Sequence, residues 1–251
     1  MTEHSFEVEK TNYLNIHHPL FPRFYSTMIN SNDYSCLLLE YIDGVTLTDI
    51  KSLKYINKND KIKIVFQLMT IIEYLHLNGF IYRDLKPDNI IIDRNKTIFL
   101  LDFNKMIKQP KMKEEMTFSV ASNFVAPEIL NGAFYTSKVD IFSLGFIIKY
   151  MFSNEEINES NLNILINECI NEDPDRRPTI SELIDVFYSD YFSKITPVFI
   201  ESIKSFHEKQ YFRHLFLITE YSNPEAQYQL GLIYKKGIHV PKYIEKAIQF
   251  F

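Results

Sequence analysis

The chain has few cysteines, no excess of basic residues and no long apolar run, and each absence excludes a class of protein. Its two cysteines, Cys36 and Cys169, are far apart in sequence, so they form neither a metal-binding spacing nor a disulfide framework. We expect both to be buried thiols in a reducing compartment. The formal net charge of −5 gives no indication of binding to nucleic acid or to an anionic membrane.

The N-terminal residues carry no recognisable targeting signal. Position 2 is Thr2 rather than glycine, which excludes N-myristoylation, and the basic and apolar regions of a signal peptide are missing. The longest apolar run, residues 141–152, is interrupted by Lys149 and is shorter than the about 20 residues that span a bilayer. We therefore expect no membrane segment and a cytoplasmic or nuclear protein.

The length of 251 residues and the apolar content of 46% fit one large globular domain, or one domain with an appendage. Apolar residues recur at helical spacing most clearly in 60–77, where Asn78 and Gly79 end the pattern. Other expected helices are 5–16, a turn opening at Pro127, 139–152, 161–170 and 179–188. Expected strands are 24–29, 34–40, 90–92 and 98–101, and residues 104–123 are expected to form a mobile loop.

One short polar segment concentrates chemically active side chains. Residues 82–89 read Tyr-Arg-Asp-Leu-Lys-Pro-Asp-Asn, and Asp102 follows the next apolar strand. Two acidic groups and an amide, brought together by a short strand pair, suit a magnesium-bound phosphate. On these residues alone, a polar loop with an acidic turn remains the alternative.

This segment resembles the H-R-D-x-K-P-x-N catalytic loop of eukaryotic protein kinases, with Tyr82 in the place of the histidine. Residues 126–128 match the A-P-E motif of that family. Residues 140–145 resemble its D-x-W-S-x-G helix, with Phe142 for tryptophan, and 173–178 resemble its D-P-x-x-R-P turn. The resemblance implies an α+β fold with a mainly helical C-lobe, ATP and Mg²⁺ as cofactors, and transfer of the γ-phosphate to a protein substrate.

The resemblance also implies roles for individual residues. Asp84 orients the substrate hydroxyl, Lys86 neutralises charge on the γ-phosphate, and Asn89 completes the catalytic set. Asn89 and Asp102 hold magnesium. The adenine of ATP lies against a hinge and strand that contribute Leu39, Glu40, Ile42 and Ile91. The K-P-x-N form is typical of serine/threonine kinases.

Further residues have regulatory or structural roles by the same resemblance. Arg83 pairs with a phosphate in the activation segment, for which Thr117, Ser119 and Ser122 are the candidate acceptors; otherwise it forms a surface ion pair. Two more expectations concern architecture. Asp140 is expected to anchor the catalytic loop, or else to cap its own helix. Glu128 and Arg177 are expected to form a buried ion pair.

Several features depart from the kinase pattern. No G-x-G-x-x-G occurs, and only eight residues precede Glu9, which is placed like the helix C glutamate but is alternatively a solvated charge. We therefore expect a partial N-lobe that lacks the strand-three lysine. Asn104 replaces a glycine, and its tolerance of left-handed backbone would preserve the turn. Ala121 and Ser122 stand where a threonine is usual. The loop 154–160 takes the place of helix G.

The C-terminal residues change character. The pattern A-x-Y-x-L-G-x-x-Y-x-x-G in 226–237, followed by K-A-x-x-F in 246–250, resembles a Sel-one-like helical repeat, which implies a protein partner. A generic helical hairpin is the alternative. We thus predict a kinase-like domain at 1–192 (partial N-lobe 1–41, C-lobe 42–192), a helical connector at 193–222 and an incomplete repeat at 223–251.

Three interpretations of function remain. The chain is a serine/threonine kinase with a protein-binding repeat, or a pseudokinase that serves as a scaffold without catalysis, or a fragment of a longer active kinase. The acidic and amide groups of the catalytic loop favour the first. The missing glycine-rich loop and lysine favour the second for these 251 residues and are explained by the third.

Overall fold

The computed structural model describes residues 3–29, 35–49, 56–109, 123–152, 162–191, 224–236, 242 and 244–248. Its helices are α1 (Glu3–Asn15), α2 (Lys58–Leu77), α3 (Pro127–Leu130), α4 (Lys138–Met151), α6 (Leu162–Cys169), α7 (Ile180–Tyr191), α9 (Pro224–Lys236) and α10 (Ile244–Ile248). Its strands are β1 (Phe24–Ile29), β2 (Ser35–Leu39), β3 (Gly44–Thr46), β4 (Phe80–Ile81), β5 (Ile90–Asp93), β6 (Ile98–Leu100) and β7 (Ile107–Lys108). Two short 3₁₀ helices are η2 (Pro87–Asn89) and η3 (Pro174–Arg176).

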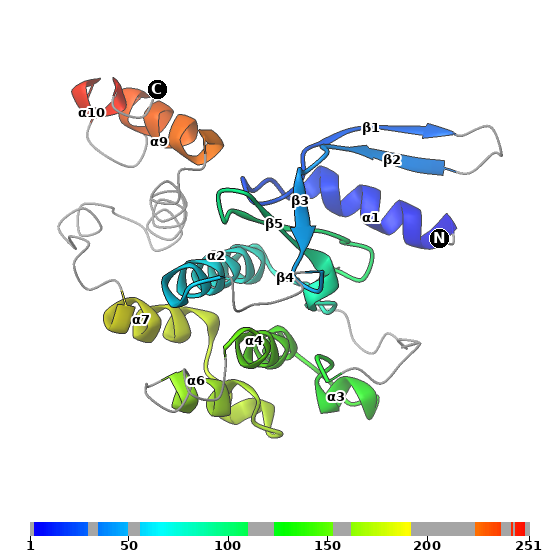
Figure 1. Cartoon of the computed structure of the whole chain (residues 1–251). Helices are drawn as coiled ribbons and strands as arrows, with labels where there is room; N and C mark the ends of the chain where they lie inside the picture. The colour runs from blue at the N-terminus through cyan, green and yellow to red at the C-terminus, as the bar shows by residue number, and fades with distance from the viewer. Residues whose placement is uncertain are drawn as a thin grey trace.

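The N-terminal part consists of one helix and one hairpin. Strands β1 and β2 pair antiparallel, with Thr27 opposite Leu37, and α1 lies along the hairpin (Figure 1). The aromatic ring of Tyr13, on α1, stacks at 6.2 Å on the ring of Phe24, at the start of β1. The helix and strand pair predicted for this part are therefore present.

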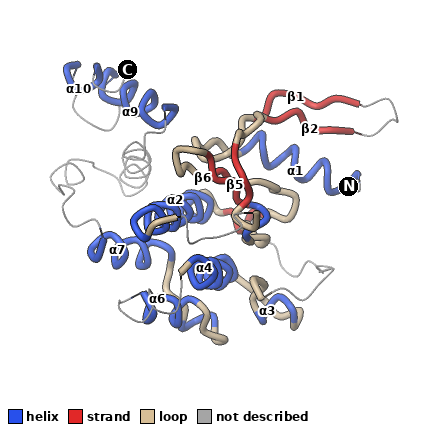
Figure 2. The backbone as a smooth tube through the Cα atoms, viewed as in Figure 1, coloured by secondary structure: helices blue, strands red, loops and turns tan. Residues whose placement is uncertain are grey.

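A three-stranded antiparallel sheet, in the order β3-β5-β6, lies between this N-terminal part and helix α2 (Figure 2). Strand β3 approaches β5 so closely that a Cβ atom on Gly44 would lie 2.6 Å from the Ile92 carbonyl oxygen. Glycine at this position is therefore a packing requirement. A separate pair, β4 with β7, flanks the catalytic-loop segment.

Helix α2 is the centre of the C-terminal lobe. Asn57 caps its first turn by accepting a hydrogen bond from the Asp60 N–H at 2.9 Å, and Gly79 ends it in a left-handed conformation with φ of 76°. Its side chains are buried on nearly every face, against β6, α4 and α7. Helix α4 packs on α6 so tightly that a Cβ on Gly145 would lie 2.6 Å from the Cβ of Cys169.

The C-terminal helices α9 and α10 pack against each other. Leu230, Tyr234 and Ala247 are buried in these two helices. No described helix is both long and apolar enough to cross a membrane.

Three short strands were not predicted. Strands β3, β4 and β7 have two or three residues each, too few to show a period, and β7 lies inside the predicted loop 104–123. Burial raises the pKa of the Cys169 thiol to about 12, as expected of a buried cysteine, whereas Cys36 is only half-buried. The predictions for the remaining activation segment (110–122), the loop 154–160 and the connector 193–222 lie outside the described residues.

Candidate functional site

The backbone of the catalytic-loop segment is anchored by one buried carboxylate. Asp140, on α4, is fully buried and accepts hydrogen bonds from the backbone N–H groups of Tyr82 at 2.9 Å and Arg83 at 2.8 Å. Its Oδ2 also lies 2.8 Å from Nε2 of His76. Arg83 has a positive φ of 69°, which costs energy in a residue with a side chain, and these bonds hold it in place. The predicted anchoring role of Asp140 agrees with this geometry, and the alternative of a helix cap does not.

The carboxylate of Asp84 accepts hydrogen bonds from the ammonium groups of two lysines. Lys86 Nζ donates to its Oδ2 at 2.9 Å, and Lys105 Nζ donates to its Oδ1 at 2.8 Å. Burial alone would raise the pKa of Asp84, but the hydrogen bonds from Lys105 and Lys86 outweigh it and lower the pKa from its usual value. Asp84 is therefore ionised at neutral pH and oriented from both sides.

Asn89, in η2, closes the loop on itself. Its amide nitrogen donates to the backbone carbonyl of Asp84 at 2.9 Å and to Asp84 Oδ2 at 3.0 Å. Because the nitrogen is used within the loop, the amide oxygen is the atom left to bind a ligand. The structure thus brings Asp84, Lys86 and Asn89 together as the sequence predicted.

Asp102 follows β6 in a left-handed conformation, with φ of 59°. Burial, and secondarily the negative charge of Asp84, raise its pKa, although the Asn104 N–H donates to its carboxylate at 3.3 Å. Asn104, whose tolerance of left-handed backbone was expected to preserve the turn, does not adopt that conformation. Asp102 takes that conformation instead, so Asn104 needs no special backbone freedom.

Helix α1 contacts the turn that begins at Asp102 through hydrogen bonds and aromatic packing. Asn12 donates from Nδ2 to the carbonyl oxygens of Phe103 at 2.7 Å and Met106 at 3.1 Å. The Tyr13 ring packs edge-on against the Phe103 ring at 4.9 Å, which in turn packs against Tyr82 at 5.8 Å. Tyr82, in the usual place of a histidine, donates its hydroxyl to the carbonyl of Leu101. Sequence reasoning did not find Asn12 or Tyr13.

Glu9 is the buried acid of α1, only 5% exposed, so its interpretation as a solvated charge is wrong. Burial, and secondarily the charge of Asp102, raise its pKa to about 7, against a hydrogen bond from the Phe103 backbone. Within the described residues no cation contacts Glu9. An ionised Glu9 therefore destabilises the fold.

The pKa of Glu9 predicts a pH dependence of stability. The folded state keeps the Glu9 proton up to pH about 7, whereas the unfolded chain loses it near 4.5, so the unfolded state binds fewer protons between these values. Stability should fall as pH rises through this window, by about 3 kcal/mol. Replacing Glu9 by Gln should remove this loss, raising the melting temperature at pH 8 but not at pH 4.

The matched control is Glu7→Gln, which changes an exposed carboxylate on the same helix that pairs with Lys10 at 3.3 Å. Thermal melts of both variants from pH 4 to pH 8 make the comparison. A Glu9→Gln profile parallel to that of the unmodified chain at every pH would show that Glu9 is not a buried, unpaired acid.

Arg83 contacts neutral acceptors in the described part of the structure. Its Nε donates to the carbonyl of Lys105 at 2.5 Å and its guanidinium donates to the Tyr135 hydroxyl at 2.7 Å. The Arg83 side chain is buried, 7% exposed, rather than at the surface. The candidate phosphate acceptors Thr117, Ser119 and Ser122 lie outside the described residues.

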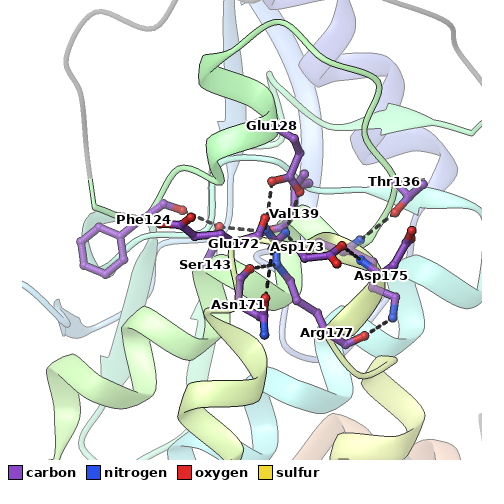
Figure 3. A network of polar contacts seen from close by, with 11 residues as sticks. Phe124, Glu128, Thr136, Val139, Ser143, Asn171, Glu172, Asp173, Asp175 and Arg177 are labelled. Carbon is purple, nitrogen blue, oxygen red and sulfur yellow. Dashed lines mark hydrogen bonds and ion pairs between the residues drawn. The ribbon is translucent and has the colours of Figure 1, made fainter.

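The predicted ion pair between Glu128 and Arg177 is present and buried (Figure 3). The guanidinium donates to both carboxylate oxygens, at 2.6 and 2.9 Å. It also donates to the carbonyls of Asn171 and Lys138 and lies 4.8 Å from the centre of the Phe142 ring. The Glu172 carbonyl accepts from the guanidinium at 3.3 Å, so all five donors of Arg177 have an acceptor, and the pair joins α3 to the turn at η3.

The predicted adenine-binding residues occupy β2, β5 and the segment after β2. Leu39 and Ile91 are half-buried, as is Ile42. The Glu40 N–H donates to the carbonyl of Arg23 at 2.8 Å, and its carboxylate accepts from the Arg23 N–H at 3.1 Å. The N–H of Glu40 is therefore used within the protein, so its carbonyl is the backbone group that could meet an adenine.

Magnesium would find oxygen ligands on Asp102 and Asn89. In the described part of the chain, no group of three or more His, Cys, Asp and Glu side chains is arranged to hold a metal by itself. One carboxylate and one amide oxygen fit Mg²⁺, which keeps several waters and takes its other ligands from phosphates. The residues present therefore suit a metal that arrives with a nucleotide.

Comparison with known proteins agrees with this geometry. A serine/threonine-protein kinase KIN1 homolog of Enterocytozoon bieneusi is 34% identical over 142 residues, 55% of this chain and 24% of that protein. A serine/threonine-protein kinase of Acanthamoeba polyphaga mimivirus is 31% identical over 169 residues, 57% of this chain and 59% of that protein. Dual specificity protein kinase pyk3 of Dictyostelium discoideum is 25% identical over 265 aligned positions, 94% of this chain and 18% of that protein.

The matched regions thus cover about a fifth to three fifths of the length of these relatives. The model of the protein kinase domain matches residues 2–163, which include α1, the loop with Asp84 and the turn at Asp102. On this match and the site geometry together, the chain belongs to the protein kinase family.

Proposed function

We propose that the protein is a serine/threonine kinase that transfers the γ-phosphate of ATP to a protein hydroxyl. The observation that carries the proposal is the arrangement around Asp84, whose carboxylate is ionised and held by Lys86 on one oxygen and Lys105 on the other. Phosphoryl transfer requires positioning and charge neutralisation more than covalent chemistry, and these residues supply both. Asp84 would orient the substrate hydroxyl, and Lys86 would neutralise the transferred phosphate.

The metal and nucleotide would be held by residues on both sides of this loop. Asn89 and Asp102 would bind Mg²⁺, which supplies charge neutralisation of the phosphates. Leu39, Ile42 and Ile91, with the carbonyl of Glu40, would hold the adenine. The restriction to serine and threonine rests on Lys86 and on the names of relatives, one of which is instead a dual specificity kinase.

A scaffold without catalysis is the second candidate, and Glu9 favours it. In the part of the chain that the structure describes, no cation contacts this buried carboxylate, which keeps its proton up to pH about 7, whereas the kinase pattern places a phosphate-binding lysine beside it. For the C-terminal segment we propose that α9 and α10 form one Sel-one-like repeat that binds a protein partner. Their mutual packing and the buried Ala247 support this proposal.

Ligand-induced stabilisation tests the nucleotide site. Mg²⁺ and ATP together should raise the melting temperature by roughly 5–10 °C, because ligand at a hundred times its Kd adds about 2.7 kcal/mol. Asp102→Asn should lose the magnesium-dependent part of this shift, since it removes the carboxylate ligand. Differential scanning fluorimetry with ATP, with and without Mg²⁺, measures both effects.

Asp88→Asn is the matched control, because Asp88 is an exposed carboxylate in the same loop that accepts a hydrogen bond from Thr48 at 3.1 Å. It should behave like the unmodified chain. The absence of any shift in the unmodified chain at millimolar nucleotide would contradict the proposed site.

A further inference from the structure

Lys105 is the feature of the site that no motif explains. It follows the Asp102-Phe103-Asn104 turn, and its ammonium group lies 2.8 Å from Asp84 Oδ1. Lys86 occupies the other oxygen of the same carboxylate at 2.9 Å. The two ammonium groups are placed alike, since their side chains are 33% and 32% exposed. A lysine without an assigned role thus matches one that the proposed function places on the γ-phosphate.

The backbone around Lys105 is held in position from two sides. Arg83 donates from Nε to the Lys105 carbonyl at 2.5 Å. Asn12 donates to the carbonyls on either side of it, those of Phe103 and Met106, at 2.7 and 3.1 Å. Both donors are buried, each 7% exposed. The Cα position of Lys105 is therefore defined by the core, and its ammonium group reaches Asp84 from a fixed origin.

The negative charges of the site provide a reason for a second lysine beside the phosphates. The site holds two carboxylates: Asp84, which accepts from both ammonium groups at 2.9 and 2.8 Å, and Asp102, three residues before Lys105. A triphosphate brings further negative charge toward both carboxylates, and Lys86 alone offsets only part of it. An ammonium group has three N–H donors, so each lysine can hold Asp84 and a phosphate oxygen at once.

We propose that Lys105 is a second phosphate-contacting lysine, which together with Lys86 binds the γ-phosphate of ATP. The proposal rests on the proposed function and adds a residue to its site. In the transfer step, the bond from the γ-phosphorus to the bridging oxygen of ADP breaks and a bond to the substrate hydroxyl oxygen forms. The hydroxyl proton leaves by way of Asp84.

The test compares the affinity for ATP with that for ADP, because only ATP carries the γ-phosphate. Isothermal titration in the presence of Mg²⁺ should show Lys105→Gln binding ATP about tenfold more weakly, while its ADP affinity changes less than about twofold. Lys105→Arg keeps the charge and should bind ATP nearly as the unmodified chain does. Lys108→Gln, which changes an exposed lysine on β7, should alter neither affinity.

Four outcomes decide the proposal. The selective loss of ATP affinity supports it. An equal loss for ATP and ADP would reduce Lys105 to a residue that holds the turn, and unchanged or tighter ATP binding would show that Lys105 only occupies Asp84; either result overturns the proposal. If the unmodified chain binds neither nucleotide, the proposed function fails first, and that result differs from every result caused by the substitution alone.

Discussion

Replacement of Asp84 by Asn is expected to lower the rate of phosphoryl transfer at least about a hundredfold without weakening the binding of Mg²⁺ and ATP. Positioned proton acceptors contribute roughly 10²–10⁴-fold to rate, and an asparagine cannot accept the hydroxyl proton. Binding should persist because Asn89 and Asp102 are unchanged. The ammonium groups of Lys86 and Lys105, now without their shared carboxylate, remain to attract phosphate.

The measurement is incorporation of the γ-phosphate into a generic protein substrate, with acid hydrolysis to identify the modified residue. Asp88→Asn serves as the control for a neighbouring charge that points to solvent. Label should appear on serine or threonine. Transfer by Asp84→Asn within threefold of the unmodified chain would remove Asp84 from the reaction, and binding without any transfer in the unmodified chain would favour the scaffold.

The second large effect is on stability. Replacement of Arg177 by Ala leaves the Glu128 carboxylate buried without its partner, and breaking such a pair costs about 3–5 kcal/mol. It also frees the carbonyls of Asn171 and Lys138, which accept from the same guanidinium. The melting temperature should therefore fall by roughly 10 °C.

The neighbouring residue provides a matched control. Arg176 is 75% exposed and lies 3.5 Å from Asp173, so Arg176→Ala should cost well under about 1 kcal/mol. Thermal melts of the two variants separate a buried network from a surface ion pair. If Arg177→Ala melts within 2 °C of Arg176→Ala, the pair with Glu128 does not support the fold.

Features that depend on residues close together in the sequence could be predicted, whereas contacts between distant residues could not be predicted from the pattern of residues alone. The segment 82–89 was found because a proline and five charged or amide side chains fall within eight consecutive residues. The C-terminal end of α2 was found because Asn78 and Gly79 act locally. The contact between Glu128 and Arg177, 49 residues apart in sequence, came from the family resemblance and not from periodicity.

The contacts that could not be predicted depend on how separate elements meet. Asn12 reaches a turn 91 residues away only because α1 packs against it with that face, and no sequence pattern specifies the angle. Lys105 lies in the segment 104–123 that was expected to be a mobile loop, and its distance to Asp84 depends on the path of the turn at Asp102. Strand β3 pairs with β5, and β4 pairs with β7, so each of these short strands depends on a partner that is distant in sequence.

Glu9 bears on two of the interpretations of function, the active kinase and the scaffold without catalysis. Its burial beside Phe103 keeps α1 in contact with the turn that carries Asp102, which favours an assembled site. Its raised pKa, caused first by burial, shows the free-energy cost of ionising the carboxylate at that position. If Glu9→Gln is more stable than the unmodified chain at pH 8 and still binds nucleotide, the assembled site does not depend on an ionised Glu9.

The most direct test of the account is a crystal structure of the chain with Mg²⁺ and a non-hydrolysable ATP analogue. We predict metal density beside Asp102 and Asn89, with the terminal phosphate in contact with both Lys86 and Lys105. A nucleotide bound away from the loop at 82–89, or a metal that contacts neither Asp102 nor Asn89, would contradict the assignment of this site.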